Sequence, residues 1–333
     1  MTAAIRARGL TKTYGGGKGL FDLDLTVETG EIFGYLGPNG AGKTTTIRLM
    51  LDFIRPGRGS LEVLGAAPSA RASRRSRAAI GYLPGELGLP ESSTGAATLS
   101  LYAGLSGGGA PLRGWLCEAL NLDAADLRKP VSTYSKGMKQ KVGIVQAMQH
   151  DPRLLILDEP TGGLDPVVQA RFFEVLREFR RRGRTIFFSS HVLSEVEAVC
   201  DRVGVLRDGR LVLDRPVPEL AAEAGRLLHV RLEAPAVAPP ASASPDLLPP
   251  RFGDSRFLRH DGAWLVYAVD PKSTPGVLRD LAEASPADFR LESALDQSLL
   301  ALYGVGPTAA AVQHPASTAA SSETPNEPSG VAS

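Results

Sequence analysis

Cysteine is scarce in this sequence, which has only Cys117 and Cys200 among its 333 residues. The two lie far apart and form no Cys-x-x-Cys pair, so the sequence does not indicate a disulfide framework. We expect both to be reduced and buried, and to act as small hydrophobic residues of a cytosolic protein.

Long hydrophobic runs are also missing. No stretch approaches the roughly 18–20 apolar residues that a bilayer-spanning helix needs. The start, MTAAIRARGL, lacks the apolar core of a signal peptide. If this protein works at a membrane, we expect another polypeptide to supply the spanning helices.

There is no excess of charge of one sign, because 37 Lys and Arg residues stand against 36 Asp and Glu residues. A nearly balanced charge gives no general affinity for nucleic acid. We therefore expect no nucleic-acid partner.

The chain is long enough for one large domain and a smaller one. Residues 1–218 alternate short β-rich runs with helical segments, which predicts an α/β domain with a mainly parallel sheet. Residues 219–306 predict a small α+β accessory domain that contains a Pro/Ala-rich loop at 233–250. Residues 307–333 have almost no large apolar side chain, and we expect this tail to be disordered.

The run GPNGAGKT, from Gly37 to Thr44, fits the phosphate-binding pattern G-x-x-x-x-G-K-[ST], with an apolar strand before it and a helix after it. Its glycines let backbone N–H groups curl around phosphate oxygens, and the helix N-terminus adds partial positive charge. We expect Lys43 to reach the outer phosphates and the Thr44 hydroxyl to ligate Mg²⁺.

Two carboxylates, Asp158 and Glu159, follow the apolar run Leu154 to Leu157, which predicts a buried strand. A carboxylate at such a strand end, beside a phosphate loop, can hold Mg²⁺ through water. The second carboxylate can act as the base for the attacking water. The pair therefore predicts metal binding by Asp158 and catalysis by Glu159.

Several motifs in order now carry a family resemblance. Tyr14, GPNGAGKTT, YSKGMKQK, LLILDEPTGGLDP and SSH together resemble the nucleotide-binding domain of an ATP-binding cassette (ABC) ATPase over about residues 4–215. The resemblance implies a parallel sheet core, an antiparallel β subdomain and a helical subdomain at about 87–150. A Ras-like GTPase is disfavoured, because no N-K-x-D motif is present.

The resemblance also assigns roles to the matching positions. Tyr14 is expected to stack on adenine, and His191 to act in catalysis as the switch that senses the γ-phosphate. The signature motif is expected to complete the nucleotide site of an opposite subunit, and the D-loop to cross the dimer interface. The expected nucleotide-binding residues are Tyr14, Gly37, Pro38, Asn39, Gly40, Ala41, Gly42, Lys43, Thr44 and Thr45; the signature is Ser135, Lys136, Gly137 and Met138; the D-loop is Gly163, Leu164 and Asp165.

The sequence departs from the family pattern in two places. Lys136 replaces a signature glycine, and its charge could lie near the γ-phosphate or in solvent. The loop GYLPGELGLP has Gly85 where the family carries the glutamine of its Q-loop, and Glu86 follows. Glu86 could serve as an oxygen ligand in place of that glutamine, or be an exposed loop carboxylate.

Three stretches, GPNGAGKTTTIRLMLDFIRPGRGSLEVLG, DRVGVLRDGRLV and the C-terminal LESALDQSLLALYG, resemble antibiotic and multidrug exporters of the daunorubicin type. This implies ATP and Mg²⁺ as cofactors, a second cassette in a homodimer, and a separate integral-membrane permease at the cytoplasmic face of a cell membrane. Helix 91–105 and the loop at Gly85 and Glu86 are the expected permease contact. The Arg-, Ala- and Gly-rich composition is typical of a bacterial protein from a GC-rich genome. The alternative is a soluble ABC ATPase that acts on ribosomes or DNA.

Overall fold

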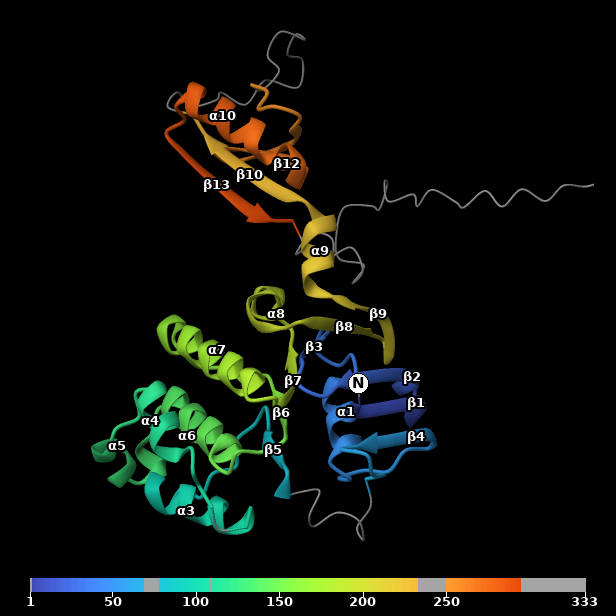
Figure 1. Ribbon diagram of the computed structural model, residues 1–333, viewed down its shortest axis with the longest axis vertical. Coiled ribbons are helices and arrows are strands. Elements are labelled where there is room, and N and C mark those ends of the chain that lie inside the picture. The colour runs from blue at the N-terminus through green and yellow to red at the C-terminus, as the bar shows by residue number, and fades with distance from the viewer. Residues whose placement is uncertain (1, 69–77, 108, 233–249, 295–333) are drawn as a thin grey trace, which may run out of the picture.

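The computed structural model describes residues 2–68, 78–107, 109–232 and 250–294, and its strands form three sheets (Figure 1). The tail expected to be disordered, 307–333, lies outside the described residues, as does all but the last residue of the Pro/Ala-rich loop at 233–250. Within the described ranges, no helix has both the length and the apolar character needed to cross a bilayer.

The largest sheet has six strands in the order β5-β6-β7-β3-β8-β9, so the chain crosses over between neighbours. The first five strands are parallel and β9 is antiparallel to β8. Three central strands are buried along their whole length, as expected for a sheet covered on both faces. The mainly parallel sheet predicted from the sequence is confirmed. The strands are β3 (Ile32–Leu36), β5 (Ile80–Leu83), β6 (Leu154–Asp158), β7 (Thr185–Ser190), β8 (Arg202–Arg207) and β9 (Arg210–Pro216).

Each face of this sheet belongs to a different core, because successive side chains of a strand point in opposite directions. In β6, Leu155 and Leu157 pack with the helices α6 (Lys136–Met148) and α7 (Pro166–Arg181). Leu154 and Ile156 pack instead with a second sheet. Strand β6 is therefore anchored from both sides, and the position of its carboxyl end is fixed.

The second sheet is antiparallel, with the order β2-β1-β4. Together with α1 (Lys43–Met50) it covers one face of the large sheet, and Figure 1 shows the helices α7 and α8 (Leu193–Val199) on the other side. The antiparallel β subdomain implied by the family resemblance is confirmed. Its strands are β1 (Ala3–Gly15), β2 (Lys18–Glu28) and β4 (Arg58–Val63).

A group of helices fills the chain between β5 and β6 (Figure 1). Its first helix starts at Gly95 rather than at residue 91, because the Thr94 hydroxyl accepts the Ala97 N–H at 3.2 Å and caps the helix there. Arg113 fastens the group by donating to Gln149 Oε1 at 2.8 Å and to Leu99 O at 3.0 Å. The helices are α3 (Gly95–Leu105), α4 (Arg113–Ala119), α5 (Ala124–Arg128) and α6.

The third sheet is antiparallel and has the order β11-β12-β10-β13. Helix α9 (Val217–Ala224) lies between this sheet and the rest of the structure (Figure 1). The helix α10 packs on it and encloses a separate small core around Leu228, Tyr267 and Leu281. These elements lie in the part of the chain, 219–306, where a small α+β accessory domain was expected. The elements are β10 (Arg226–Arg231), β11 (Arg256–Asp261), β12 (Trp264–Val269), α10 (Thr274–Ala284) and β13 (Asp288–Ser293).

The expected division at residue 218 falls inside α9. Val217 and Leu220 of this helix are buried in the core that contains α6 and α7. Gly225 follows with φ of 75°, a backbone conformation that favours glycine, and β10 begins directly after it. A division at Gly225 is therefore our proposal for the boundary.

Candidate functional site

The glycine-rich loop joins β3 to α1, and its conformation depends on glycine. Gly40 and Gly42 have φ of 83° and 112°, where a side chain would be strained. At Gly37, an added Cβ would lie 2.6 Å from the Leu206 carbonyl oxygen. The loop and the first turn of α1 line a pocket of about 160 Å³. Its lining residues are Pro38, Asn39, Gly40, Gly42, Lys43, Thr44, Thr45 and Glu159.

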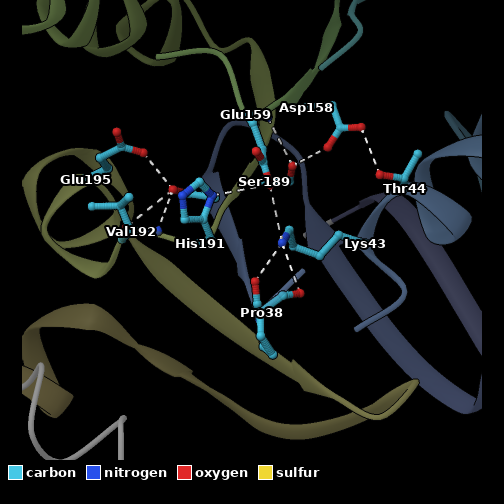
Figure 2. A network of polar contacts seen from close by, with 11 residues as sticks. Pro38, Lys43, Thr44, Asp158, Glu159, Ser189, His191, Val192 and Glu195 are labelled. Carbon is cyan, nitrogen blue, oxygen red and sulfur yellow. Dashed lines mark hydrogen bonds and ion pairs between the residues drawn. The ribbon is translucent and has the colours of Figure 1, made fainter. Parts of the chain in front are cut away.

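Lys43 begins α1 and is buried, yet its ammonium group is well partnered. Nζ donates to Gly37 O at 2.6 Å and to Pro38 O at 3.3 Å, and lies 3.4 Å from Glu159 Oε1. Figure 2 shows the amine placed between the loop and the end of β6. A cation fixed at the mouth of a glycine loop can bind phosphate oxygens, as predicted for Lys43.

Asp158 ends β6 next to this lysine and is also buried. Its Oδ2 accepts the Thr44 hydroxyl at 3.2 Å, and its Oδ1 accepts the Ser189 hydroxyl at 2.6 Å (Figure 2). The pair predicted to hold Mg²⁺ is thus brought together from residues 114 positions apart. A carboxylate and a hydroxyl are oxygen donors of the kind that Mg²⁺ prefers, so these two side chains fit the metal.

Glu159 follows the strand in a left-handed conformation, with φ of 49°. Its N–H donates to Ser189 O at 3.2 Å, which fixes the turn to the neighbouring strand β7. The carboxylate lies 3.3 Å from His191 Nδ1, and His191 is half-exposed. The predicted base, the predicted switch and Lys43 therefore meet at one point, the carboxyl edge of the parallel sheet, where ligands of such sheets bind.

The signature residues lie at the start of α6. The Ser135 hydroxyl caps the helix by accepting the Met138 N–H at 3.2 Å. Lys136 is exposed, which favours the solvent alternative, and its methylene carbons lie close to Gly163, where an added Cβ would be 3.0 Å from Cγ. Within the described residues, no hydrogen bond or ion pair joins the signature to the glycine loop of the same chain.

The D-loop precedes α7 and touches the signature. An added Cβ on Gly137 would lie 2.7 Å from the Gly163 carbonyl oxygen, so the two loops are in close contact. Asp165 caps α7 by accepting the Val168 N–H at 2.9 Å, and this hydrogen bond lowers the pKa of its carboxyl group. Asp165 therefore acts as the N-cap of α7, and Leu164 is partly buried against the helical core.

The loop that lacks glutamine runs past Asp158. An added Cβ on Gly85 would lie 3.5 Å from Asp158 O and 3.7 Å from Oδ2, so this position is adjacent to the carboxylate predicted to hold the metal. Glu86 is exposed, and it makes no hydrogen bond or ion pair within the described part of the chain. Burial and the Asp158 charge raise the pKa of the neighbouring Tyr82.

Tyr14 lies near the end of β1 and is 54 % exposed. Lys12 Nζ lies over its ring, 5.9 Å from the centroid. Three glycines with positive φ, Gly15 to Gly17, follow it and turn the chain into β2. The exposed ring is available for stacking, as the predicted adenine contact requires.

Four side chains that the sequence reasoning did not single out complete the site. Ser189 bonds Asp158, and Ser190 and Gln169 bond the buried Glu195. The serines lie in the motif SSH, which marks their position but not their partners. Gln169 and Glu195 lie in helices with no pattern that separates them from other polar helix residues.

Gln140 of the signature helix is also part of this framework. It is buried, and its Nε2 donates to Pro160 O at 2.6 Å. This hydrogen bond ties α6 to the residue that follows Glu159. The signature helix is therefore hydrogen-bonded to the turn that carries the predicted base.

A family model described as "ABC transporter" matches residues 20–162. An ABC transporter ATP-binding protein of Nostoc is 44 % identical over 201 residues, which span 59 % of each chain. The bacitracin transport ATP-binding protein of Bacillus licheniformis is 36 % identical over 70 % of this chain and 76 % of its own. The Nod factor export ATP-binding protein I of Rhizobium meliloti is 38 % identical over 64 % of each chain.

Solved structures have the same fold. The structure of an ATP-binding subunit of an ABC transporter matches with a TM-score of 0.61 and 30 % identity, over 67 % of this chain and 93 % of its own. The match therefore takes in nearly all of that solved cassette.

Proposed function

Since the chain belongs to the family of ABC transporter ATP-binding proteins, we propose that it powers the export of a drug, an antibiotic or a lipid-like compound through a separate permease. The observation that carries this proposal is the meeting of Lys43, Asp158, Glu159 and His191 at one edge of the sheet. Export is supported by relatives named for bacitracin transport and Nod factor export.

ATP binds in the glycine loop, where Lys43 and the N-terminus of α1 offer positive charge to its phosphates. We propose that Thr44 and Asp158 hold Mg²⁺, Asp158 through water. The ion would neutralise negative charge on the terminal phosphates. Ser189 keeps Asp158 in place through its 2.6 Å hydrogen bond.

Glu159 is the proposed base for the attacking water. Its carboxylate is held near both a cation and an imidazole, at 3.4 Å from Lys43 Nζ and 3.3 Å from His191 Nδ1. His191 is half-exposed and can therefore contact the γ-phosphate directly. We propose that it reports the presence of this phosphate to the rest of the chain.

A homodimer is the proposed assembly. The sequence has one phosphate loop and one signature, and no described contact joins them within the chain. Two copies arranged head to tail would place Ser135 of one against the phosphate bound by the other. Hydrolysis then removes contacts that hold the dimer closed, so nucleotide biases a two-state interface.

The permease is proposed to dock on a groove of about 340 Å³ beside the expected loop and helix α3. Its walls include Tyr82, Leu87 and Tyr102. Leu101 and Leu105 are exposed one helical turn apart on α3, at 52 % and 74 %. Exposed apolar side chains beside a groove suit an amphipathic helix from another protein.

Leu105→Glu is expected to reduce co-purification of the permease by at least about tenfold, because it places a charge in an apolar interface. ATP hydrolysis by the isolated subunit should stay within about twofold of wild type, since the side chain is exposed. Leu278→Glu on α10 is the matched control, a leucine 42 % exposed outside the groove. Equal permease recovery with both variants would place the contact elsewhere.

The role of the glutamine-free loop is tested by Glu86→Ala and Gly85→Gln. Because Glu86 is exposed and unbonded in the described residues, we expect Glu86→Ala to leave ATP hydrolysis within about twofold. An added Cβ at Gly85 would lie no closer than 3.5 Å to any neighbouring atom, and Gly85→Gln would bring an amide oxygen near Asp158, so it is expected to strengthen Mg²⁺-dependent ATP binding. A large loss with Glu86→Ala, measured in both hydrolysis and Mg²⁺ titration, would instead make Glu86 an oxygen ligand.

The direct test of export begins with the neighbouring genes, where a permease gene would support export, and continues by expressing that permease together with this chain. Cells that express both proteins should become resistant to the cargo class, and the assembled complex should show cargo-stimulated ATP hydrolysis in vesicles. Co-sedimentation with ribosomes or DNA in the absence of membranes would favour the soluble alternative instead.

A further inference from the structure

A buried carboxylate lies behind the switch histidine. Glu195 belongs to α8 and is only 8 % exposed. Its Oε2 accepts the Ser190 hydroxyl at 2.6 Å, and its Oε1 accepts Gln169 Nε2 at 3.1 Å. A buried carboxylate needs hydrogen-bond donors from the protein in place of water. Removal of either donor from Glu195 should therefore destabilise this arrangement.

The Ser190 hydroxyl holds both ends of the turn that contains His191. It donates to Glu195 and accepts the Val192 N–H at 2.9 Å. His191 lies between Ser190 and Val192 in the chain, and its half-exposed side chain has Glu159 as a near neighbour. Because half of the imidazole is exposed, its position depends largely on the backbone on either side.

Gln169 connects this turn to the D-loop helix. It lies in α7, one turn after the cap, and its N–H donates to Asp165 O at 2.9 Å. Glu195 therefore joins two segments that the proposed mechanism uses separately, the loop that leads into α7 and the turn that carries the histidine.

We propose that Glu195 is a positioning residue, whose hydrogen bonds to Ser190 and Gln169 hold the turn of His191 in register with the D-loop helix. This inference rests on the proposed function, because it assigns a purpose to the turn in ATP hydrolysis. Glu195 does not touch the phosphate pocket and acts only through its two partners.

The test uses a polarity swap. Glu195→Ala removes both hydrogen bonds, and Gln169→Glu sets a second carboxylate against the first with almost no change of shape. Each is expected to lower kcat about tenfold, in line with the loss of hydrogen bonds to a charged group. The KM for ATP should stay within about twofold, because the glycine loop is untouched. The double variant Glu195→Gln with Gln169→Glu can rebuild both hydrogen bonds and should recover kcat to within about threefold.

Ser194→Ala is the matched control, since this serine is exposed on the same helix one position away. Hydrogen exchange at the Val192 amide gives a readout that does not need ATP hydrolysis. Exchange should quicken in Glu195→Ala and return to the wild-type rate in the swapped double variant.

Unchanged kcat and unchanged Val192 exchange in Glu195→Ala would overturn the proposal. A loss of kcat that the swap does not recover, with a lowered Tm, would reduce Glu195 to a folding role and overturn it as well. If the wild-type protein hydrolyses no ATP, the proposed function fails, and the exchange rates then show separately whether Glu195 holds the turn.

Discussion

Replacing Glu159 by glutamine should lower ATP hydrolysis by about 10²–10⁴-fold, the contribution of a general base. Glutamine has nearly the same shape, so it should keep the turn after β6 while removing the charge that takes the proton from water. ATP binding should survive, because Lys43 still donates to the two loop carbonyl oxygens. The ATP-bound dimer should therefore accumulate, and gel filtration with ATP and Mg²⁺ would detect it.

The position of Glu159 makes this result specific. Its backbone is fixed by hydrogen bonds to Ser189, and its φ of 49° holds the carboxylate toward Lys43 and His191. Glu174→Gln on α7 is the matched control, since that glutamate is 70 % exposed and pairs with Arg177. Near-wild-type turnover in Glu159→Gln would show that another group accepts the proton.

Replacing Gly95 by alanine should lower the stability of the folded chain, because the added methyl group would clash with the residue before the signature serine. An added Cβ would lie 2.3 Å from the Tyr134 hydroxyl oxygen, which itself donates to Asp126 O at 2.7 Å. Overpacking of this kind costs about 1–3 kcal/mol. Thermal unfolding of the chain should then shift down by roughly 2–12 °C.

Tyr134→Phe supplies the second arm of a double-mutant cycle, because it removes the oxygen that clashes. Rescue should be partial, since Leu127 Cδ2 and Tyr134 Cζ would still lie 3.1 and 3.2 Å from the new methyl group. Gly104→Ala in the same helix is the control: nothing lies within 4 Å of its added Cβ, so alanine should be neutral or stabilising. Additive effects of Gly95→Ala and Tyr134→Phe would mean that the two residues do not interact.

The structure gives Tyr134, the residue before the signature serine, a role that the sequence did not indicate. In the structure its hydroxyl fastens the signature to α5, across the start of α3. The neighbouring Gly95 leaves room for the ring.

The sequence by itself determined the phosphate loop, the carboxylates after β6 and the mainly parallel sheet. Each depends on residues that are adjacent in the chain, or on the rule that parallel strands end at one edge. Lys43 and Thr44 came from the loop pattern and Asp158 from its place after a buried strand, whereas His191 came from the family resemblance.

Only the tertiary structure decided which distant side chains hold these groups. Ser189, Gln169 and Glu195 act across 26 to 31 residues through hydrogen bonds with no sequence period. The same holds for the contact of Lys136 with Gly163, which comes from the packing of two loops. Local pattern fixes where a strand or helix ends, whereas the choice of a buried polar partner depends on how the elements pack.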